Sequence, residues 1–142
     1  MALNTEQKTL VEERVLEGER AAFASRGVQF EKCVFANGES PLKESRGIAL
    51  SGCNFEWKYP LWYCDDVQVE NCVWLEMARS GVWYTNNIVV SNSVLQAPKN
   101  FRRCNGVELN NVTFADAAET LWMCQGVRLN QVQARGDYFA LN

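Results

Sequence analysis

The feature that most restricts the fold of this chain is a sixfold repeat with 18 to 21 residues per unit. The six units span residues 26–45, 46–64, 65–85, 86–104, 105–124 and 125–142. When the units are aligned, the second position of each is Gly, Asn or Asp: Gly27, Gly47, Asp66, Asn87, Gly106 and Gly126. These residue types accept a backbone with positive φ, which β-branched residues avoid. Each unit is therefore predicted to begin with a tight turn.

Two short apolar stretches follow the turn in each unit. The first consists of the column Val28, Ile48, Val67, Ile88, Val107 and Val127 and, two positions later, the column Phe30, Leu50, Val69, Val90, Leu109 and Leu129. The second consists of Cys33, Cys53, Cys72, Ser93, Val112 and Val132 and, two positions later, Phe35, Phe55, Trp74, Leu95, Phe114 and Ala134. Alternation with a period of two residues predicts short strands with one buried face. Polar pairs between the two stretches indicate a second turn.

A third strand closes each unit, after a corner of variable length. Its inward column is predicted to be Leu42, Leu61, Val82, Phe101, Leu121 and Phe139. Three strands and three corners in about 20 residues are typical of one coil of a parallel β-solenoid, whose coils lie about 4.8 Å apart. A leucine-rich repeat has a similar period, but its fixed leucines are absent here. We therefore predict an all-β fold, a single-stranded parallel β-helix of about six coils.

The two ends of the chain lie outside the regular pattern. Residues 1–25 are predicted to form an N-terminal cap and a partial coil, in which residues 9–16 form either a short amphipathic helix or an extra strand. Val15 to Gly18 resembles a strand and turn, which favours the strand. The sequence stops at Asn142, level with the end of a coil and without a cap. We expect either a longer solenoid or an end that stacks against a partner, as in a homo-oligomer.

Charge and hydropathy exclude several kinds of partner. The formal net charge is −3 and the pI is near 5.0, so a nucleic-acid or anionic membrane surface is not expected. No signal peptide and no apolar run of roughly 18 residues are present, which favours a cytoplasmic protein. The chain has no histidine, and none of its six cysteines forms a Cys-x-x-Cys pair. The cysteines are therefore predicted to be buried structural thiols, and neither a metal nor a cofactor is expected.

Several segments are similar to a known family: ESPLKES at 39–45, WKYPLWYC at 57–64, WYTNN at 83–87, FRRC at 101–104, AETLW at 118–122 and GDYFA at 136–140. The chain resembles an uncharacterised bacterial family catalogued as domain of unknown function 3737, which is grouped with the pectate-lyase-like β-helices. The resemblance covers residues 17–142 and corresponds to the N-terminal half of longer members. It implies a right-handed parallel β-helix. It brings no established activity, and therefore no catalytic residues.

The residue types of one column in the third strand do not follow from packing alone. This column reads Phe23, Lys43, Trp62, Trp83, Arg102, Trp122 and Ala140. If the preceding column points inward, strand alternation places this one outside and the next one, which includes Tyr63 and Tyr84, on the opposite face. An exposed stripe of this kind suits stacking on sugar rings or holding an anion. The alternative is that the stripe packs inward as core, with Lys43 and Arg102 paired to carboxylates.

The predicted ligand-binding residues are Lys43, Trp62, Trp83, Arg102 and Trp122. They predict a non-catalytic binding or scaffold module that engages a glycan or a small anionic ligand. One alternative is a carbohydrate-active enzyme, a polysaccharide lyase or glycoside hydrolase, that uses Glu44 or Glu119 with Arg102, Arg103 and Lys43. The glutamates alone do not single out this alternative, because any chain with many glutamates offers some pair of carboxylates at a hydrolase distance. A structural, self-associating solenoid is the third alternative. The Asn column at the second turn, which includes Asn71, Asn92 and Asn111, is predicted to be structural.

Overall fold

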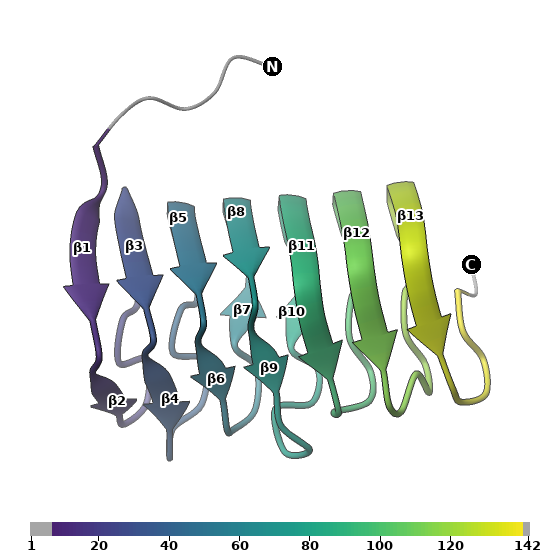
Figure 1. Ribbon diagram of the computed structural model, residues 1–142, viewed down its shortest axis with the longest axis horizontal. Helices are drawn as coiled ribbons and strands as arrows, with labels where there is room; N and C mark the ends of the chain where they lie inside the picture. The colour runs from purple at the N-terminus through teal and green to yellow at the C-terminus, as the bar shows by residue number, and fades with distance from the viewer. Residues whose placement is uncertain (1–6, 141–142) are drawn as a thin grey trace.

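The computed structural model describes residues 7–140, and its strands stack as a parallel β-solenoid (Figure 1). Every strand pairing is parallel, and the described residues contain no helix. The strands are β1 (Thr9–Glu12), β2 (Val15–Glu17), β3 (Val28–Glu31), β4 (Val34–Ala36), β5 (Arg46–Ser51), β6 (Asn54–Phe55), β7 (Leu61–Trp62), β8 (Asp65–Glu70), β9 (Val73–Trp74), β10 (Val82–Trp83), β11 (Asn86–Leu95), β12 (Asn105–Phe114) and β13 (Gln125–Ala134). The predicted fold class is confirmed.

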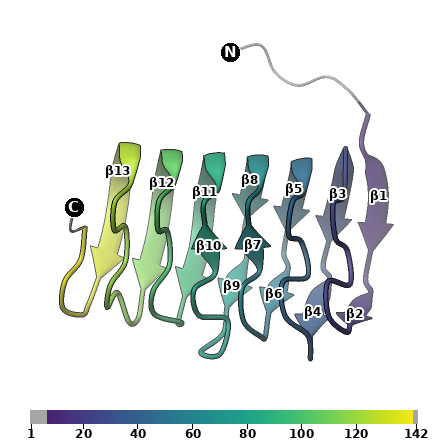
Figure 2. The same ribbon diagram turned by 180° about the vertical axis from the view of Figure 1, so that it is seen from behind.

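The register between coils follows the alignment of the sequence repeat. On the first side of the coil, Ile88 of β11 pairs with Val67 of β8 and with Val107 of β12. On the second side, Phe55 of β6 pairs with Phe35 of β4 and Trp74 of β9. The inward columns predicted for these two sides are therefore stacked ladders. Seen from behind, β7 and β10 form the third side (Figure 2), where they pair with each other.

The turns that open the coils have the predicted left-handed backbone. All six second positions have a positive φ, from 56° at Asp66 and Asn87 to 83° at Gly106. The second turn repeats this conformation at Asn71, Asn92 and Asn111. Asn111 Nδ2 donates to Asn92 Oδ1 at 2.8 Å, and Asn92 Nδ2 donates to Glu70 Oε1 at 3.0 Å. These hydrogen bonds between coils confirm the structural interpretation of the Asn column.

At the N-terminal end, the two alternatives for residues 9–16 are resolved in favour of strands. Thr9 of β1 pairs with Val28 of β3, and Val15 of β2 pairs with Val34 of β4. These residues extend the ladders of the first and second sides by one coil. They thereby supply backbone partners to the edges of β3 and β4, which is what an exposed sheet edge requires.

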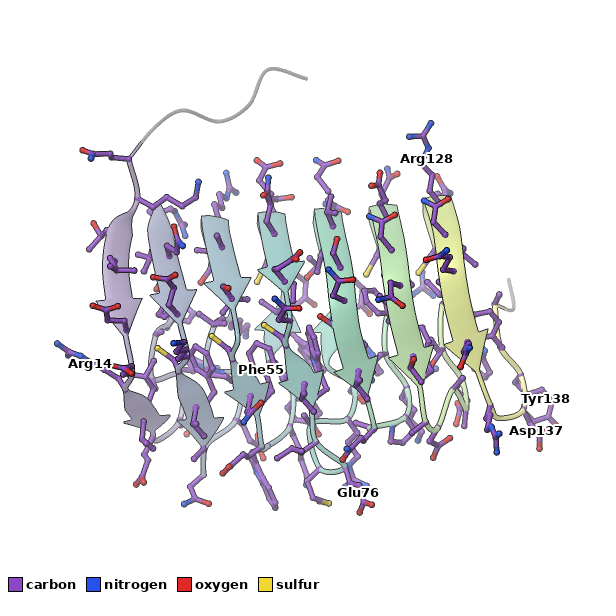
Figure 3. The ribbon with its side chains drawn as sticks, viewed as in Figure 1. Arg14, Phe55, Glu76, Arg128, Asp137 and Tyr138 are labelled. Carbon is purple, nitrogen blue, oxygen red and sulfur yellow. The ribbon has the colours of Figure 1, made fainter. Side chains whose placement is uncertain are left out.

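The core is a narrow column of apolar side chains inside the coils, and Figure 3 shows Phe55 pointing into it. Phe35, Phe55 and Trp74 stack along the second side, with ring centroids 5.1 and 4.7 Å apart. The predicted inward column of the third side is buried from Leu42 to Leu121, and Phe139 packs against the core. Layers of this kind repeat from coil to coil, so each coil buries its apolar side chains against its neighbours.

Small hydroxyl and thiol side chains line the interior at the corners. The column that contains Cys64 also holds Ser45 and Thr85, and all three are buried. Cys64 Sγ donates to the carbonyl of Leu42 at 3.2 Å, and Thr85 Oγ1 donates to the carbonyl of Leu61 at 2.9 Å. The six cysteines are free, and five of them are buried. The prediction of buried structural thiols is confirmed, because these side chains satisfy backbone groups where corners interrupt the strand ladders.

Candidate functional site

The third side places the predicted ligand-binding column on the outside of the solenoid. The residues that come immediately before this column in the chain, such as Leu61 and Val82, are fully buried. Because successive residues of a strand point to opposite faces, Trp62 and Trp83 point outward, and both are half-buried. Isolated bridges continue the register from Trp83 to Arg102 and from Arg102 to Trp122. The alternative in which this column forms part of the core is therefore wrong.

The outward side chains form one continuous stack along the solenoid axis. The rings of Trp62 and Trp83 are parallel, with centroids 5.0 Å apart and an interplanar angle of 4°. The guanidinium carbon of Arg102 lies 4.7 Å from the ring centroid of Trp83 and 5.0 Å from that of Trp122. Tyr59 packs on Trp62 at 4.6 Å. We call these five residues the aromatic stack, and its cation–π contacts hold Arg102 between two indoles.

Each indole of the aromatic stack is anchored to the corner of the next coil. Trp62 Nε1 donates to the carbonyl of Ser80 at 2.6 Å, and Trp83 Nε1 donates to the carbonyl of Lys99 at 2.9 Å. Trp122 Nε1 donates in the same way to the carbonyl of Tyr138. These hydrogen bonds fix the ring orientations, and they use the polar atom of every indole in the stack.

The neighbouring column also lies outside, which differs from the expectation of opposite faces. Tyr63 and Tyr84 stack at 4.8 Å with an interplanar angle of 3°, and their rings are edge-on to Trp62 and Trp83. The reason is a left-handed backbone at this column, with φ of 57° at Tyr63 and 55° at Tyr84. That conformation ends the third strand after two residues, so strand alternation no longer applies. The same positive φ occurs in this column at Ala24, Glu44, Arg103 and Met123.

Charged side chains surround the aromatic stack. Glu119 bridges two cations: its Oε1 lies 3.7 Å from Arg102 Nη2, and its Oε2 lies 3.7 Å from Lys99 Nζ. Lys43 Nζ lies 5.8 Å from the ring centroid of Tyr63. We use "aromatic face" for the stack together with Tyr63, Tyr84, Met123, Lys43, Glu44, Lys99, Arg103 and Glu119. Its four Lys and Arg residues and two Glu residues leave a net charge of +2, whereas the whole chain carries −3.

The candidate catalytic residues are not assembled into a hydrolase pair. Glu44 belongs to the first of the six coils and Glu119 to the fifth, so the axial distance between them is about 19 Å at about 4.8 Å per coil. This exceeds the roughly 6.5–9.5 Å that separates the carboxylates of an inverting glycosidase. Arg102 contacts Glu119, whereas Arg103 is exposed and forms no ion pair among residues 7–140. Glu44 and Glu119 therefore do not lie at the separation of a hydrolase pair.

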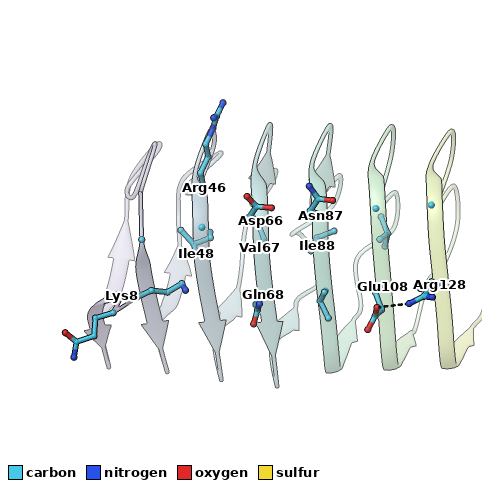
Figure 4. Close-up of a pocket in the computed structure, with 17 residues that line it drawn as sticks. Lys8, Arg46, Ile48, Asp66, Val67, Gln68, Asn87, Ile88, Glu108 and Arg128 are labelled. Carbon is cyan, nitrogen blue, oxygen red and sulfur yellow. Dashed lines mark ion pairs between the residues drawn. The ribbon is translucent and has the colours of Figure 1, made fainter. Parts of the chain in front are cut away.

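A groove runs along another edge of the solenoid. It has a volume of about 790 Å³ and follows the first corner across the coils (Figure 4). Its floor is the turn column of Gly27, Gly47, Asp66, Asn87, Gly106 and Gly126. Charges of both signs border it, including Arg46, Asp66 and the ion pair of Arg128 with Glu108 at 4.0 Å. The repeat pattern predicted the turns but not the groove that they form.

Two further observations concern other classes of site. Among residues 7–140, no group of three or more Cys, Asp or Glu side chains is arranged to hold a metal ion. Within the same range, no helix has the length and apolar character needed to cross a bilayer. Glu76, which lies in the corner after β9, is exposed and points into solvent (Figure 3).

The fold and the aromatic face define the chain as a parallel β-solenoid with a stacked aromatic and cationic column on its third side. The chain belongs to the family described as "Protein of unknown function (DUF3737)", whose model matches residues 9–142. No curated protein matches the chain, and no solved structure does. The right-handed winding, the link to pectate lyases, the bacterial origin, the cytoplasmic location and the self-association stay predictions.

Proposed function

We propose that this protein is a non-catalytic binding module whose aromatic face engages an anionic ligand, most simply an acidic glycan. The observation that carries the proposal is the outward stack of Tyr59, Trp62, Trp83, Arg102 and Trp122. The core of the third side is already closed by the inward column, so packing does not require large aromatic residues outside it. Trp, Tyr and Arg are also the residue types enriched at binding hot spots.

The geometry of the stack favours an anion over a sugar ring stacked on an indole. Trp62 covers one face of Trp83, and the Arg102 guanidinium covers the other. A ligand approaching Trp83 from solvent therefore meets the edge of its ring rather than a face. The edge of an aromatic ring carries the positive part of its quadrupole, which attracts negative charge. Lys43, Lys99, Arg102 and Arg103 add formal positive charge at the same surface.

A glycan array followed by titration tests the proposal. We expect wild type to bind acidic glycans and to bind neutral glycans of equal length more weakly. Trp83→Ala is expected to reduce affinity at least tenfold, because it removes the ring that holds Arg102 on one side. Its melting curve must show a folded protein at the assay temperature. Absence of binding to every acidic glycan would remove the proposal.

A matched pair of charge substitutions separates local from general electrostatics. Arg103→Gln removes one positive charge from the aromatic face, and Lys32→Gln removes one from the second corner. Both residues are exposed and have nearly the same φ, 51° and 52°. We expect Arg103→Gln to weaken binding roughly three- to tenfold and Lys32→Gln to leave it nearly unchanged, because charges beyond a Debye length of about 8 Å are screened. Equal losses would place the ligand elsewhere.

A further inference from the structure

The aromatic face already holds one carboxylate between two cations, that of Glu119. Each of its two oxygens faces a different cation, Arg102 Nη2 and Lys99 Nζ, and both distances are 3.7 Å. A carboxylate that lies between two cations is the arrangement that the acidic group of a ligand would adopt on this surface. The corner that carries Glu119 is tied to the preceding coil by the hydrogen bond from Lys99 N–H to the carbonyl of Ala118, at 2.9 Å.

The contacts of Glu119 are long, and solvent reaches them. Charge-assisted hydrogen bonds between nitrogen and oxygen are about 2.7–2.9 Å long, so neither contact is a close hydrogen bond. The side chains of Arg102, Glu119 and Lys99 are 25%, 32% and 47% exposed. Partly exposed ion pairs of this length contribute little to stability. An anion from solution therefore has access to the same two cations.

Arg102 keeps its position without Glu119. Its guanidinium lies between the rings of Trp83 and Trp122, at 4.7 and 5.0 Å from their centroids. Both indoles are in turn anchored to backbone carbonyls. Contacts on the faces of a guanidinium leave its N–H donors, which lie in the guanidinium plane, free to point outward. The donors remain oriented for a second carboxylate when the Glu119 side chain rotates away.

We propose that Glu119 is an internal competitor that occupies the position of a ligand carboxylate on Arg102 and Lys99. The inference rests on the proposed function and specifies it: the ligand is recognised through a carboxylate, and it displaces Glu119 to bind. A neutral glycan has no group that replaces the Glu119 carboxylate on the two cations. Removing the charge of Glu119 is therefore expected to strengthen binding, which is the opposite of the effect of removing a ligand-binding residue.

The test uses the full chain and two oligosaccharides of equal length, alginate hexamers as the carboxylate probe and cellohexaose as the neutral one. Tryptophan fluorescence and calorimetry follow binding to wild type, Glu119→Gln and Arg102→Gln. Glu13→Gln serves as the control, because it changes the net charge equally and lies away from the aromatic face. Glu13 and Glu119 also share a φ of 53°. Backbone effects of the two substitutions are therefore comparable.

We expect Glu119→Gln to bind alginate hexamers roughly two- to fivefold more tightly than wild type, the range for one exposed ion pair. Glu13→Gln is expected to match wild type, and Arg102→Gln to lose at least tenfold. If wild type binds alginate and Glu119→Gln binds no better than Glu13→Gln, the competitor role is wrong and the proposed function stands. Equal affinity for cellohexaose would overturn recognition through a carboxylate. If neither alginate nor cellohexaose binds to wild type or to Glu119→Gln, both proposals are overturned.

Discussion

Gly81 lies beneath the aromatic face, immediately before Val82 and Trp83 of β10, and its replacement by alanine is expected to destabilise the solenoid strongly. An added Cβ would lie 2.3 Å from Asn100 Oδ1 and 2.7 Å from both Cδ1 and Nε1 of Trp74. Trp74 and Asn100 are fully buried. Neither side chain is the free end of a flexible group, so the backbone or the packed indole must move.

The expected cost can be estimated from the local contacts. Overpacking of a close-packed core costs about 1–3 kcal/mol. Gly81 N–H donates to Asn100 Oδ1 at 2.8 Å, and displacing Asn100 removes this hydrogen bond at about 0.5–1.5 kcal/mol. Restriction of the unfolded chain by alanine returns about 0.4–1 kcal/mol. The net loss in the free energy of unfolding is therefore about 0.5–4 kcal/mol, with a central value of about 2 kcal/mol.

Urea denaturation followed by tryptophan fluorescence measures this loss. With an m value of about 2 kcal/mol/M, the central value corresponds to a fall of the midpoint by about 1 M. Gly27→Ala is the matched control, because a Cβ at Gly27 meets no atom within 4 Å and only its φ of +60° opposes alanine. That strain costs about 1–2 kcal/mol, and restriction of the unfolded chain returns the same amount as at Gly81, about 0.4–1 kcal/mol. A midpoint shift for Gly81→Ala equal to or smaller than that for Gly27→Ala would refute the packing argument.

Three further predictions concern the backbone, the thiols and the tryptophans. Arg103 has a φ of 51°, so the Arg103→Gly variant is expected to be more stable than Arg103→Ala by up to about 1 kcal/mol. Arg128 lies in β13, so the order is expected to be reversed there, with Arg128→Gly less stable than Arg128→Ala. Urea midpoints of the four variants measure both differences. Burial raises the pKa of Cys64 to about 11 from 9.0, so the buried thiol stays protonated while the unfolded one ionises. Stability is then expected to fall as the pH rises from 9 to 11, and to fall less in Cys64→Ser. Iodide is expected to quench the three half-buried indoles of the aromatic stack partly and the buried Trp74 not at all, so full protection of the stack would contradict an accessible face.

The repeat in the sequence was sufficient to predict the fold because each coil repeats the same constraints. A glycine, asparagine or aspartate marks the first turn, and alternating apolar residues mark the two strands that follow. The pairing of Ile88 with Val67 and Val107 confirms the alignment at single-residue precision. A shift of one residue would have exposed every inward side chain. Pattern and register are therefore strongly coupled in this fold.

The third corner could not be predicted in the same way. Its left-handed column is occupied by Glu44, Tyr63, Tyr84, Arg103 and Met123, none of which marks a positive φ. A non-glycine residue in this conformation costs about 1–2 kcal/mol, and the packing of adjacent coils must outweigh that cost. Because the sequence lacks the turn signal, it predicted a longer third strand and placed the tyrosines on the opposite face. The contact between Glu119 and Arg102 was also hidden, since it depends on how corners of variable length fold back.

The edge-on presentation of the indoles follows from the solenoid itself. Coils lie about 4.8 Å apart, and the ring centroids of Trp62 and Trp83 are 5.0 Å apart. Aromatic residues in consecutive coils of one column therefore stack on each other and cover their own faces. A free face requires a small residue in the neighbouring coil, and between Trp62 and Trp122 the column offers none. Arg102 fills the one place in this run without an indole, so the surface combines positive ring edges with a rigidly held guanidinium. Such a surface is suited to binding through charge and planar hydrogen bonds, which is the physical reason why we propose a carboxylate as its ligand.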